Sequence, residues 1–292
     1  MIKRFAPAKL NLCLHVTGQR KDGYHELDSI VVHLDQGDLI VAEPADEISL
    51  SLSGAFCEGI PGDGSNLVLK AAHLLAESAQ GRFGAKISLL KNLPCAAGIG
   101  SGSSDAAATL QLLSVLWNIT LPDERTLSTL GADVPVSMSS ELSRMEGIGE
   151  RLTHLGKPPM LNVLLINPAV ELPTPKVFAA LTEKYNPPMP KVLPQLKSAE
   201  QWVAWLEFQR NDLETAAVTL CPIVGKVLRA LREYSGVKLA RMSGSGATCF
   251  ALFTSDIEAQ KAEAYFKAKQ PNWWVRAAKT WNGNDQLSRS TT

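Results

Sequence analysis

Ten consecutive residues at 98–107, GIGSGSSDAA, carry no side chain larger than that of Ile99. The segment 85–90 before them is predicted to be a strand, and 106–117 after them is predicted to be a helix. A glycine-rich loop that leads into a helix N-terminus is a typical anion site, because its free N–H groups converge and phosphate oxygens can reach the backbone. The run therefore predicts a phosphate site. A tight strand-to-helix connection that binds nothing is the alternative.

The common nucleotide-binding loops do not account for this run. A Walker A loop requires G-x-x-x-x-G-K-[ST], which neither 156–158 (GKP) nor 225–227 (GKV) supplies. A dinucleotide-binding fingerprint would need a surrounding βαβ alternation, and a protein-kinase loop would need H-R-D and D-F-G motifs, which do not occur. Ser103, Ser104 and Asp105 favour a ligand, since their oxygens can cap a helix but can also bind the Mg²⁺ of a triphosphate.

Composition excludes several other classes of protein. The 292 residues include 29 basic and 29 acidic side chains, so no overall charge attracts nucleic acid or an anionic membrane. The five cysteines lie far apart without a C-x-x-C pair, which argues against a disulfide framework and a zinc site. No signal peptide and no apolar run of membrane-spanning length is recognisable, so we expect a soluble, cytoplasmic protein.

The N-terminal segment shows the alternation of a strand. Apolar residues occupy every second position from 10 to 16, and Lys9 and Asn11 share the other face, which the pattern predicts to be unburied. Two further strands are predicted on either side of a turn at DQGD (35–38).

We expect an α+β chain of two domains, with the boundary at the proline-containing segment KPPM. The first domain covers 1–157 and the second 158–281, and a polar tail over 282–292 is expected to be disordered. In the second domain, Thr174 is predicted to cap a helix that begins with Pro175.

Three segments together resemble the GHMP kinases, the superfamily of galactose, homoserine, mevalonate and phosphomevalonate kinases. They are PCAAGIGSGSSDAA (94–107), PAKLNLCLHVTGQRKDGYHEL (7–27) and SGSGATCF (243–250). GADVP (131–135) and PTPKVF (173–178) narrow the resemblance to one member, whose alcohol substrate carries cytidine diphosphate. The resemblance implies a ribosomal-S5-like N-terminal domain and a ferredoxin-like α+β C-terminal domain, with both substrates in the cleft between them.

The implied activity is ATP- and Mg²⁺-dependent phosphorylation of the 2-hydroxyl of cytidine diphosphate methylerythritol, in the non-mevalonate route to isoprenoid precursors. The resemblance makes Lys9 and Asp133 the catalytic residues: Lys9 helps to ionise the hydroxyl, and Asp133 takes its proton. Judged from the residues alone, a lysine on a strand face is more often solvated, and an aspartate soon after Gly131 is more often a turn or capping residue.

The remaining implied roles concern ligand binding. The residues that the resemblance places on ATP are Asn66, Lys91, Pro94, Cys95, Ala96, Ala97, Gly98, Ile99, Gly100, Ser101, Gly102, Ser103 and Ser104. Ser104 is also the candidate Mg²⁺ ligand. The residues placed on the substrate are Asn11, Tyr24, His25, Thr174 and Phe178, in which aromatic rings stack on cytosine and the histidine reads its edge.

Two other functions stay open at this point. Another GHMP kinase, of the mevalonate or homoserine type, would lack the base site at Tyr24, His25 and Phe178. An RNA-binding module with an S5-like fold is disfavoured by the zero net charge and by the absence of any run of lysine and arginine.

Overall fold

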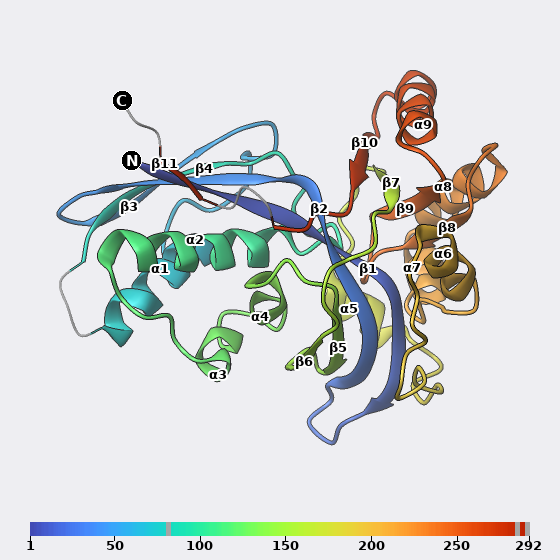
Figure 1. Ribbon diagram of the computed structural model, residues 1–292, viewed down its shortest axis with the longest axis horizontal. Coiled ribbons are helices and arrows are strands. Elements are labelled where there is room, and N and C mark those ends of the chain that lie inside the picture. The colour runs from blue at the N-terminus through green and yellow to red at the C-terminus, as the bar shows by residue number, and fades with distance from the viewer. Residues whose placement is uncertain (80–82, 284–286, 290–292) are drawn as a thin grey trace.

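The computed structural model describes residues 1–79, 83–283 and 287–289. These residues form two bodies that lie side by side, each built on a β-sheet with helices, and one pair of long strands reaches both (Figure 1). No helix in the described part of the chain combines the length and the apolar character needed to span a lipid bilayer.

The first body contains a seven-stranded sheet. Its main strands follow the order β11-β1-β2-β4-β3, and β5 pairs with both β2 and β6. The pair β3 and β4 is parallel, and the other pairs are antiparallel. The strands are β1 Ile2–Gln19, β2 His25–Pro44, β3 Ile48–Ser53, β4 Ala85–Leu90, β5 Ser143–Gly147, β6 Arg151–His154 and β11 Leu287–Arg289.

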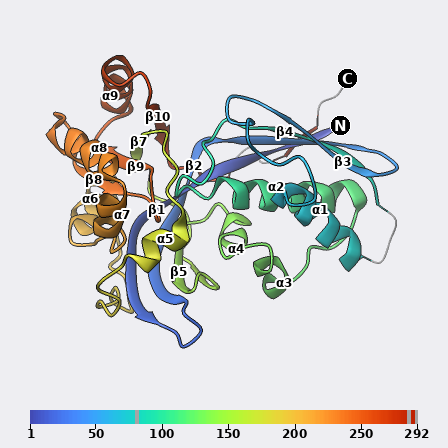
Figure 2. The same ribbon diagram turned by 180° about the vertical axis from the view of Figure 1, so that it is seen from behind.

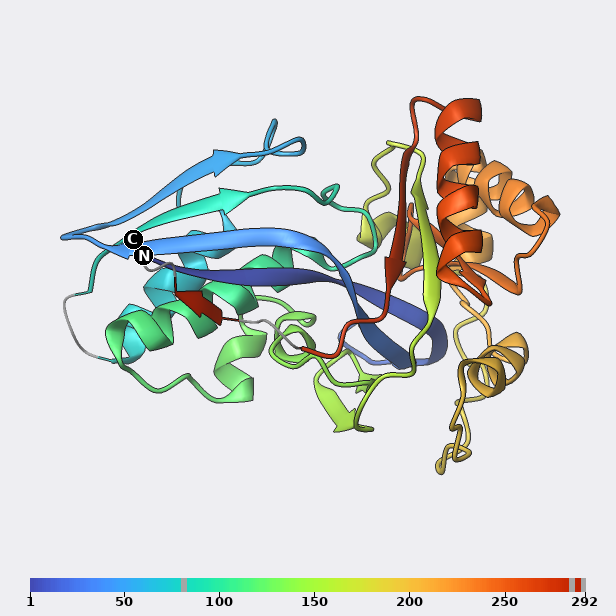
Figure 3. The same cartoon turned by 45° about the horizontal axis from the view of Figure 1, so that its top comes forward.

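Helices cover one face of this sheet (Figures 1 and 3). They are α1 Leu67–Ser78, α2 Ser101–Trp117, α3 Glu124–Ser128 and α4 Val134–Ser137. The run of small residues continues into α2 as Ala106, Ala107 and Ala108, which are buried in the core with residues of α1 and the sheet. Because alanine side chains are short, α2 can lie close to the strands that hold its first turn in place.

The second body contains a four-stranded antiparallel sheet in the order β10-β7-β9-β8. Along the chain, helices separate β7 from β8 and β9 from β10, and β8 is followed directly by β9. This is the βαββαβ connectivity of a ferredoxin-like fold, as predicted. Helices α6 to α9 of this body lie on the opposite side of the molecule from helices α1 to α4 of the first body. Helix α5 lies at the junction between the two bodies (Figure 2). The elements are β7 Asn162–Asn167, α5 Thr174–Ala179, α6 Ala199–Glu207, α7 Glu214–Leu220, α8 Pro222–Glu233, β8 Leu239–Met242, β9 Cys249–Phe253, α9 Asp256–Lys269 and β10 Trp274–Lys279.

The turn predicted at DQGD is wrong, because residues 35–38 lie inside the single long strand β2. The register between β1 and β2 shifts here: Pro7 pairs with Gly37, but Lys9 pairs with His33, which makes the segment a β-bulge. A Cβ at Gly37 would overlap the backbone of β1. The polar, glycine-containing residues 35–38 therefore form a bulge within one strand and not a turn between two strands.

Both faces of β1 are buried, so the prediction of an unburied Lys9 face is wrong. Leu10 and Leu12 pack in a core cluster with residues of the second sheet, and Lys9 and Asn11 are themselves only 4% and 1% exposed. Alternation separates an apolar face from a polar one, but it does not show whether another segment covers the polar face. Here the loop before α2 and the loop 243–247 cover it.

The two bodies do not correspond to two uninterrupted stretches of chain. Leu14 and Val16 of β1 belong to the same core cluster as Leu164 of β7 and Val227 of α8. The N-terminal hairpin therefore contributes to the core of the second body as well as the first. The predicted boundary at 157/158 falls in the connection between β6 and β7.

The C-terminal tail is partly structured. Leu287–Arg289 pairs antiparallel with Ile2–Arg4 of β1, so the expectation of disorder is wrong for this segment. Residues 284–286 and 290–292 of the predicted tail lie outside the described residues.

Candidate active site

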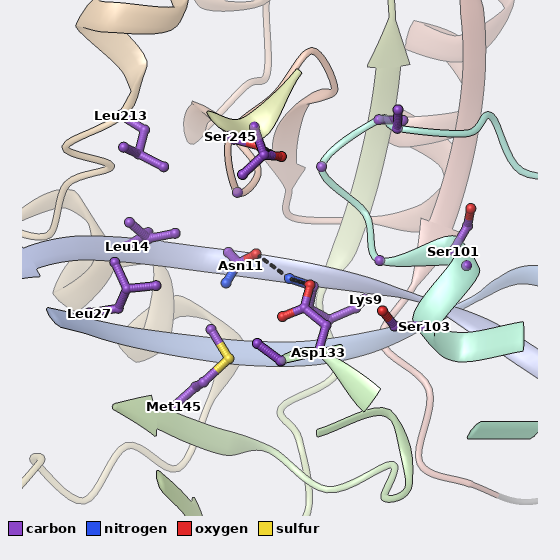
Figure 4. Close-up of a pocket in the computed structure, with 18 of the residues that line it drawn as sticks. Lys9, Asn11, Leu14, Leu27, Ser101, Ser103, Asp133, Met145, Leu213 and Ser245 are labelled. Atoms are coloured by element: carbon purple, nitrogen blue, oxygen red, sulfur yellow. Dashed lines mark hydrogen bonds and ion pairs between the residues drawn. The ribbon is translucent and has the colours of Figure 1, made fainter. Parts of the chain in front are cut away.

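A cavity of about 390 Å³ opens where the two bodies meet (Figure 4). Residues from β1, the loop and first turn of α2, the start of α4, α5 and the loop 243–247 line it. A cavity of about 670 Å³ adjoins it near the β1–β2 hairpin, and one of about 240 Å³ adjoins it between α1 and α2. We refer to these as the central, hairpin and α1 cavities. Because neighbouring cavities share lining residues, together they form one elongated groove.

The first turn of α2 faces the central cavity. Gly100 is the N-cap residue in a left-handed conformation, with φ of 63°, and no side chain caps the helix. The N–H of Ser104 donates to the carbonyl of Gly100, so the N–H groups of Ser101, Gly102 and Ser103 precede the first intrahelical hydrogen bond. All three residues line the cavity. These free donors and the positive end of the helix dipole form a site suited to a phosphate group.

The loop before this turn is fixed by hydrogen bonds from both bodies. The carbonyl oxygens of residues 97, 98 and 99 accept from Thr248 N at 3.1 Å, Ser243 Oγ at 2.9 Å and Lys9 N at 2.9 Å, in that order. Gly98 has a φ of 74°, and a Cβ on it would overlap the Ser243 carbonyl oxygen. The small side chains of the loop thus allow a close backbone contact between the two bodies, and they also leave the cavity open.

Lys9 and Asp133 form an ion pair inside the central cavity (Figure 4). The Lys9 Nζ lies 2.9 Å from Asp133 Oδ2 and donates to Asn11 Oδ1 at 2.9 Å. The Lys9 side chain is 5% exposed and that of Asp133 is 32% exposed. The ammonium therefore lies at the bottom of the cavity, and the carboxylate is open to a ligand.

The geometry does not support a capping role for Asp133. It occupies the N-cap position of α4, but its side chain makes no capping hydrogen bond. Its carboxylate points instead toward Lys9. Gly100 lies next to this pair, and a Cβ added to Gly100 would lie 3.0 Å from Lys9 Cε. The local structure leaves the carboxylate free for the cavity.

Asn11 is held by a chain of polar contacts within the strand pair. Its Nδ2 donates to Ser29 Oγ at 2.8 Å, and that hydroxyl donates to the carbonyl of Cys13 at 2.6 Å. The Asn11 backbone N–H donates to Ser243 Oγ at 3.2 Å. The Asn11 amide is therefore oriented before any ligand binds, with its oxygen toward Lys9.

His33 of β2 pairs with Lys9 of β1, and it is a site residue that was not predicted from the sequence. It is fully buried, and neither ring nitrogen has a hydrogen-bond partner among the described residues. Burial, and to a smaller degree the charge of Lys9, lowers the pKa of His33 to about 4. The ring is therefore neutral near pH 7 and adds no charge next to the Lys9–Asp133 pair. A histidine within an apolar strand gives no sequence signal of this position.

Tyr24, His25 and Phe178 meet in the hairpin cavity, as predicted, although about 150 positions separate the first two from the third. The His25 and Phe178 rings stack with centroids 4.9 Å apart and planes at 26°, whereas Tyr24 is 61% exposed. Burial, followed by the charge of Lys184, lowers the pKa of His25, so its ring is neutral at pH 7. His25 Nε2 has no partner within the described part of the chain, and a neutral imidazole offers one donor and one acceptor.

Thr174 lines both the central and the hairpin cavities. The prediction that it caps a helix is wrong: Pro173 is the N-cap residue of α5, and Thr174 is the first helical residue. Its hydroxyl forms a hydrogen bond of 2.7 Å with Ser245 Oγ, which the sequence analysis did not assign to the site. This contact joins α5 to the loop 243–247 at the edge of the groove.

Asn66 and Lys91 both line the α1 cavity. Asn66 caps α1 by accepting from Val68 N at 2.8 Å, and its Nδ2 donates to the Pro61 carbonyl at 2.8 Å. The Lys91 ammonium is 2% exposed and is already engaged by two aspartates, Asp38 and Asp105. Both residues therefore line one cavity of the groove, but their polar groups have protein partners, and their contact with ATP stays a prediction.

Ser104 does not line any of the three cavities of the groove. Its side chain is buried toward a small separate hollow next to Arg4 and Gln111, and its Oγ has no partner among the described residues. The preceding hydroxyl, Ser103, faces the central cavity instead. Consecutive helical residues point about 100° apart, and this step turns Ser104 away from the cavity that Ser103 faces.

The oxygen donors that line the central cavity include the carboxylate of Asp133 and the hydroxyl of Ser103, which could bind a divalent cation. Among the described residues, no group of three or more His, Cys, Asp and Glu side chains could hold a metal ion by itself. Mg²⁺ is commonly bound by one or two carboxylates together with substrate phosphates. The donor set therefore fits a cation that arrives with a nucleotide.

Comparison with known families matches both parts of the chain. The model for the N-terminal domain of GHMP kinases matches residues 66–141, which include the first turn of α2 and Asp133. The model for the GHMP kinase C-terminal domain matches residues 193–272, which include the loop 243–247.

Individual proteins match over nearly the whole length. The chain is 49% identical over 280 residues to 4-diphosphocytidyl-2-C-methyl-D-erythritol kinase of Cereibacter sphaeroides, covering 96% of this chain and 99% of that protein. It is 50% identical over 273 residues to the kinase of the same name from Paracoccus denitrificans, with 94% of each chain covered.

Solved structures show the same relationship. The crystal structure of 4-(cytidine 5'-diphospho)-2C-methyl-D-erythritol kinase matches with a TM-score of 0.78 and 31% identity, covering 96% of this chain and 100% of that one. Homoserine kinase from Cytophaga hutchinsonii matches with a TM-score of 0.69 and 19% identity over 98% and 96% of the two chains, which shows a common fold.

Proposed function

The chain belongs to the GHMP kinases, and within them to the 4-diphosphocytidyl-2-C-methyl-D-erythritol kinases, and on this basis we propose that it phosphorylates the 2-hydroxyl of 4-diphosphocytidyl-2-C-methyl-D-erythritol with ATP. The observation that carries the proposal is the position of the Lys9–Asp133 pair beside the uncapped first turn of α2, in one cavity. A phosphate donor and an alcohol acceptor can meet there.

The groove has a compartment for each part of the two substrates. In our proposal the triphosphate lies along Ser101 to Ser103, and the nucleoside of ATP enters the α1 cavity next to Asn66. The cytidine of the acceptor enters the hairpin cavity, where Tyr24 and Phe178 offer aromatic faces and His25 offers its unpaired nitrogen. The reacting hydroxyl and the γ-phosphate then meet at Asp133.

The proposed reaction needs little covalent chemistry from the protein. The 2-hydroxyl oxygen bonds to the γ-phosphorus, the bond from that phosphorus to the β–γ bridging oxygen breaks, and ADP leaves. The hydroxyl proton passes to a carboxylate oxygen of Asp133, which also orients the hydroxyl. Lys9 holds that carboxylate in place and neutralises charge where two anionic substrates meet. Positioning and charge neutralisation dominate catalysis of phosphoryl transfer.

We also propose that Mg²⁺ accompanies ATP and is held by Asp133 and Ser103 in place of the predicted Ser104. When bound, the ion neutralises charge on the phosphate oxygens. The backbone donors of α2 contribute only partial charges, so a further positive charge besides Lys9 is needed against a triphosphate.

Measuring ADP release with a panel of acceptors tests the proposed function. The panel contains 4-diphosphocytidyl-2-C-methyl-D-erythritol, mevalonate and homoserine, with phosphorus NMR to identify the product. We expect turnover with the first compound alone and a new phosphomonoester at its 2-position. Phosphorylation of mevalonate or homoserine in preference to it would overturn the substrate assignment and would leave the kinase assignment in place.

A further inference from the structure

The segment 210–213, which connects α6 to α7, was not predicted from the sequence to contribute to the site. It is attached to β1 at Leu14. The Leu14 N–H donates to the carbonyl of Arg210 at 2.9 Å, and the Asp212 N–H donates to the carbonyl of Leu14 at 2.9 Å. Leu14 itself lines the central cavity (Figure 4). The backbone at Asn211 is therefore fixed against β1 at the edge of the cavity.

The side chain of Asn211 reaches from this segment to the loop 243–247. Its Nδ2 donates to two backbone carbonyls, those of Met242 and Gly244, each at 2.8 Å. Its Oδ1 accepts from the N–H of Leu213 at 3.0 Å, and the residue is only 7% exposed. Both hydrogens of the amide are used, so a side chain with fewer than two donors could not make the same contacts.

The two carbonyls that Asn211 holds lie on either side of Ser243, which is fully buried. The Ser243 hydroxyl donates to the carbonyl of Gly98 at 2.9 Å, in the loop before α2, and it accepts from the N–H of Asn11 at 3.2 Å. One hydroxyl therefore joins the loop before α2 to the strand that carries Lys9.

Gly244 packs closely between the same two segments. It has a φ of 55°, and a Cβ on it would lie 3.0 Å from the Gly98 carbonyl oxygen and 3.3 Å from Asn11 Oδ1. Asn11 Oδ1 is also the atom that accepts from Lys9 Nζ at 2.9 Å. A displacement of residues 242–244 would therefore shift Asn11, and with it Lys9, relative to the loop before α2.

We propose that Asn211 is a positioning residue for phosphoryl transfer. By holding the carbonyls on both sides of Ser243, its amide fixes the Ser243 hydroxyl, which in turn sets the position of Asn11 and Lys9 relative to the first turn of α2. A misplacement of about 1 Å between reacting groups can lower a rate by about 10²-fold. The inference rests on the proposed function, because that function assigns the acceptor hydroxyl to the Lys9–Asp133 pair and the phosphate donor to the first turn of α2.

Steady-state kinetics of Asn211→Asp and Asn211→Ser tests the inference. Both variants keep an oxygen that can accept from the Leu213 N–H and so form the local turn, but neither can donate to both carbonyls. We expect kcat to fall about tenfold or more in each, with the KM of either substrate changed less than about threefold, because the groups that bind the substrates are all still present. If Asn211 served only to form the turn, Asn211→Asp would keep the wild-type kcat.

Asn186→Ser is the matched control. Asn186 Nδ2 also donates to two backbone carbonyls, those of Val16 at 3.2 Å and Glu183 at 3.3 Å, and neither of these residues is among those that line the groove. We expect its kcat to stay close to that of the wild type. Circular dichroism at the assay temperature checks that each variant is folded, and Asn211→Ser, which buries no charge, gives the result if Asn211→Asp does not fold.

A double variant separates positioning through Ser243 from a general structural defect. Ser243→Ala removes the hydroxyl that joins the two segments and should itself lower kcat. Adding Asn211→Ser to it should lower kcat little further, because residues that act through one contact are not additive. A wild-type kcat in a folded Asn211→Asp or Asn211→Ser, or losses that multiply in the double variant, overturns the inference. Failure of the wild type to phosphorylate the acceptor overturns the proposed function instead.

Discussion

The two ends of the groove are built in opposite ways. At the α1 end, a short stretch of chain from Lys91 to Asp105 supplies the loop, the free backbone donors and most of a buried charged cluster. At the hairpin end, side chains from two distant segments meet, and one of them, Tyr24, is largely exposed. In the proposed function, the first end binds phosphate with backbone atoms and the second binds the base with side chains.

This difference predicts how each end responds to mutation. Backbone donors cannot be removed by changing a side chain, so the α1 end is sensitive to substitutions that add bulk. The hairpin end is sensitive to substitutions that remove a ring or a ring nitrogen. The Lys9–Asp133 pair lies between the two ends and should affect turnover more than the binding of either substrate.

The largest effect is expected at this junction. Asp133→Asn keeps the size of the side chain but removes the charge that pairs with Lys9, and with it the group that we propose takes the proton. We expect kcat to fall by a factor of about 10² or more, since positioned acid–base groups typically contribute ~10²–10⁴-fold. Steady-state kinetics gives kcat, and calorimetry with ATP in the absence of Mg²⁺ serves as the control and should give a nearly unchanged Kd. Near-normal turnover would exclude Asp133 from the reaction.

A smaller effect is expected at the α1 end. A Cβ at Gly102 would contact only Leu67 Cδ1, at 3.4 Å, so a larger side chain fits the fold but occupies the cavity. We expect Gly102→Val to weaken ATP binding by at least about tenfold, which corresponds to ~1.4 kcal/mol. The Tm should change little.

Gly98→Ala is the matched control for this prediction. Its Cβ would overlap the Ser243 carbonyl, so it should lower the Tm by disturbing the contact between the bodies. If Gly102→Val instead had a wild-type ATP affinity and a wild-type Tm, the phosphates would not lie along this turn.

The smallest effect is expected at the hairpin end. Cytosine has an amine donor where uracil has a carbonyl acceptor, and an unpaired buried polar group costs ~1–3 kcal/mol. We expect kcat/KM for the uridine analogue of the substrate to be about tenfold or more below that for the cytidine compound. His25→Ala should remove much of this preference, and Phe178→Ala should lower kcat/KM for both compounds together. Equal use of both by the wild type would contradict base reading by His25.

The same difference explains what could be predicted from the sequence. The small-residue loop is a local motif, so its strand, loop and helix follow from the pattern of 85–117, although α2 begins at Ser101, five residues before the predicted start. The convergence of Tyr24, His25 and Phe178 depends on the whole fold and came only from the resemblance to a family. Their roles in binding stay predictions.

Other features could not be predicted because the decisive contact is distant in sequence. The bulge at DQGD places Asp38 against Lys91, and nothing near residue 38 indicates that partner. Lys9 was expected on an unburied face because the loops that cover it lie about 90 and 235 residues further along the chain. Ser103 and Ser104 differ only in the direction that the helix gives them.

The hydrogen bonds that fix residues 97–99 determine how the groove can open. Because β1 and the loop 243–247 both donate to this short segment, a wide hinge motion of one body away from the other would break these bonds and strand buried carbonyl groups. We therefore expect residues 97–99 to be ordered before ATP binds, so that the entropy of ordering them is not lost on binding. We therefore expect substrates to enter and leave without a wide separation of the two bodies, and exposed side chains such as Tyr24, between β1 and β2, to be the ones that rearrange.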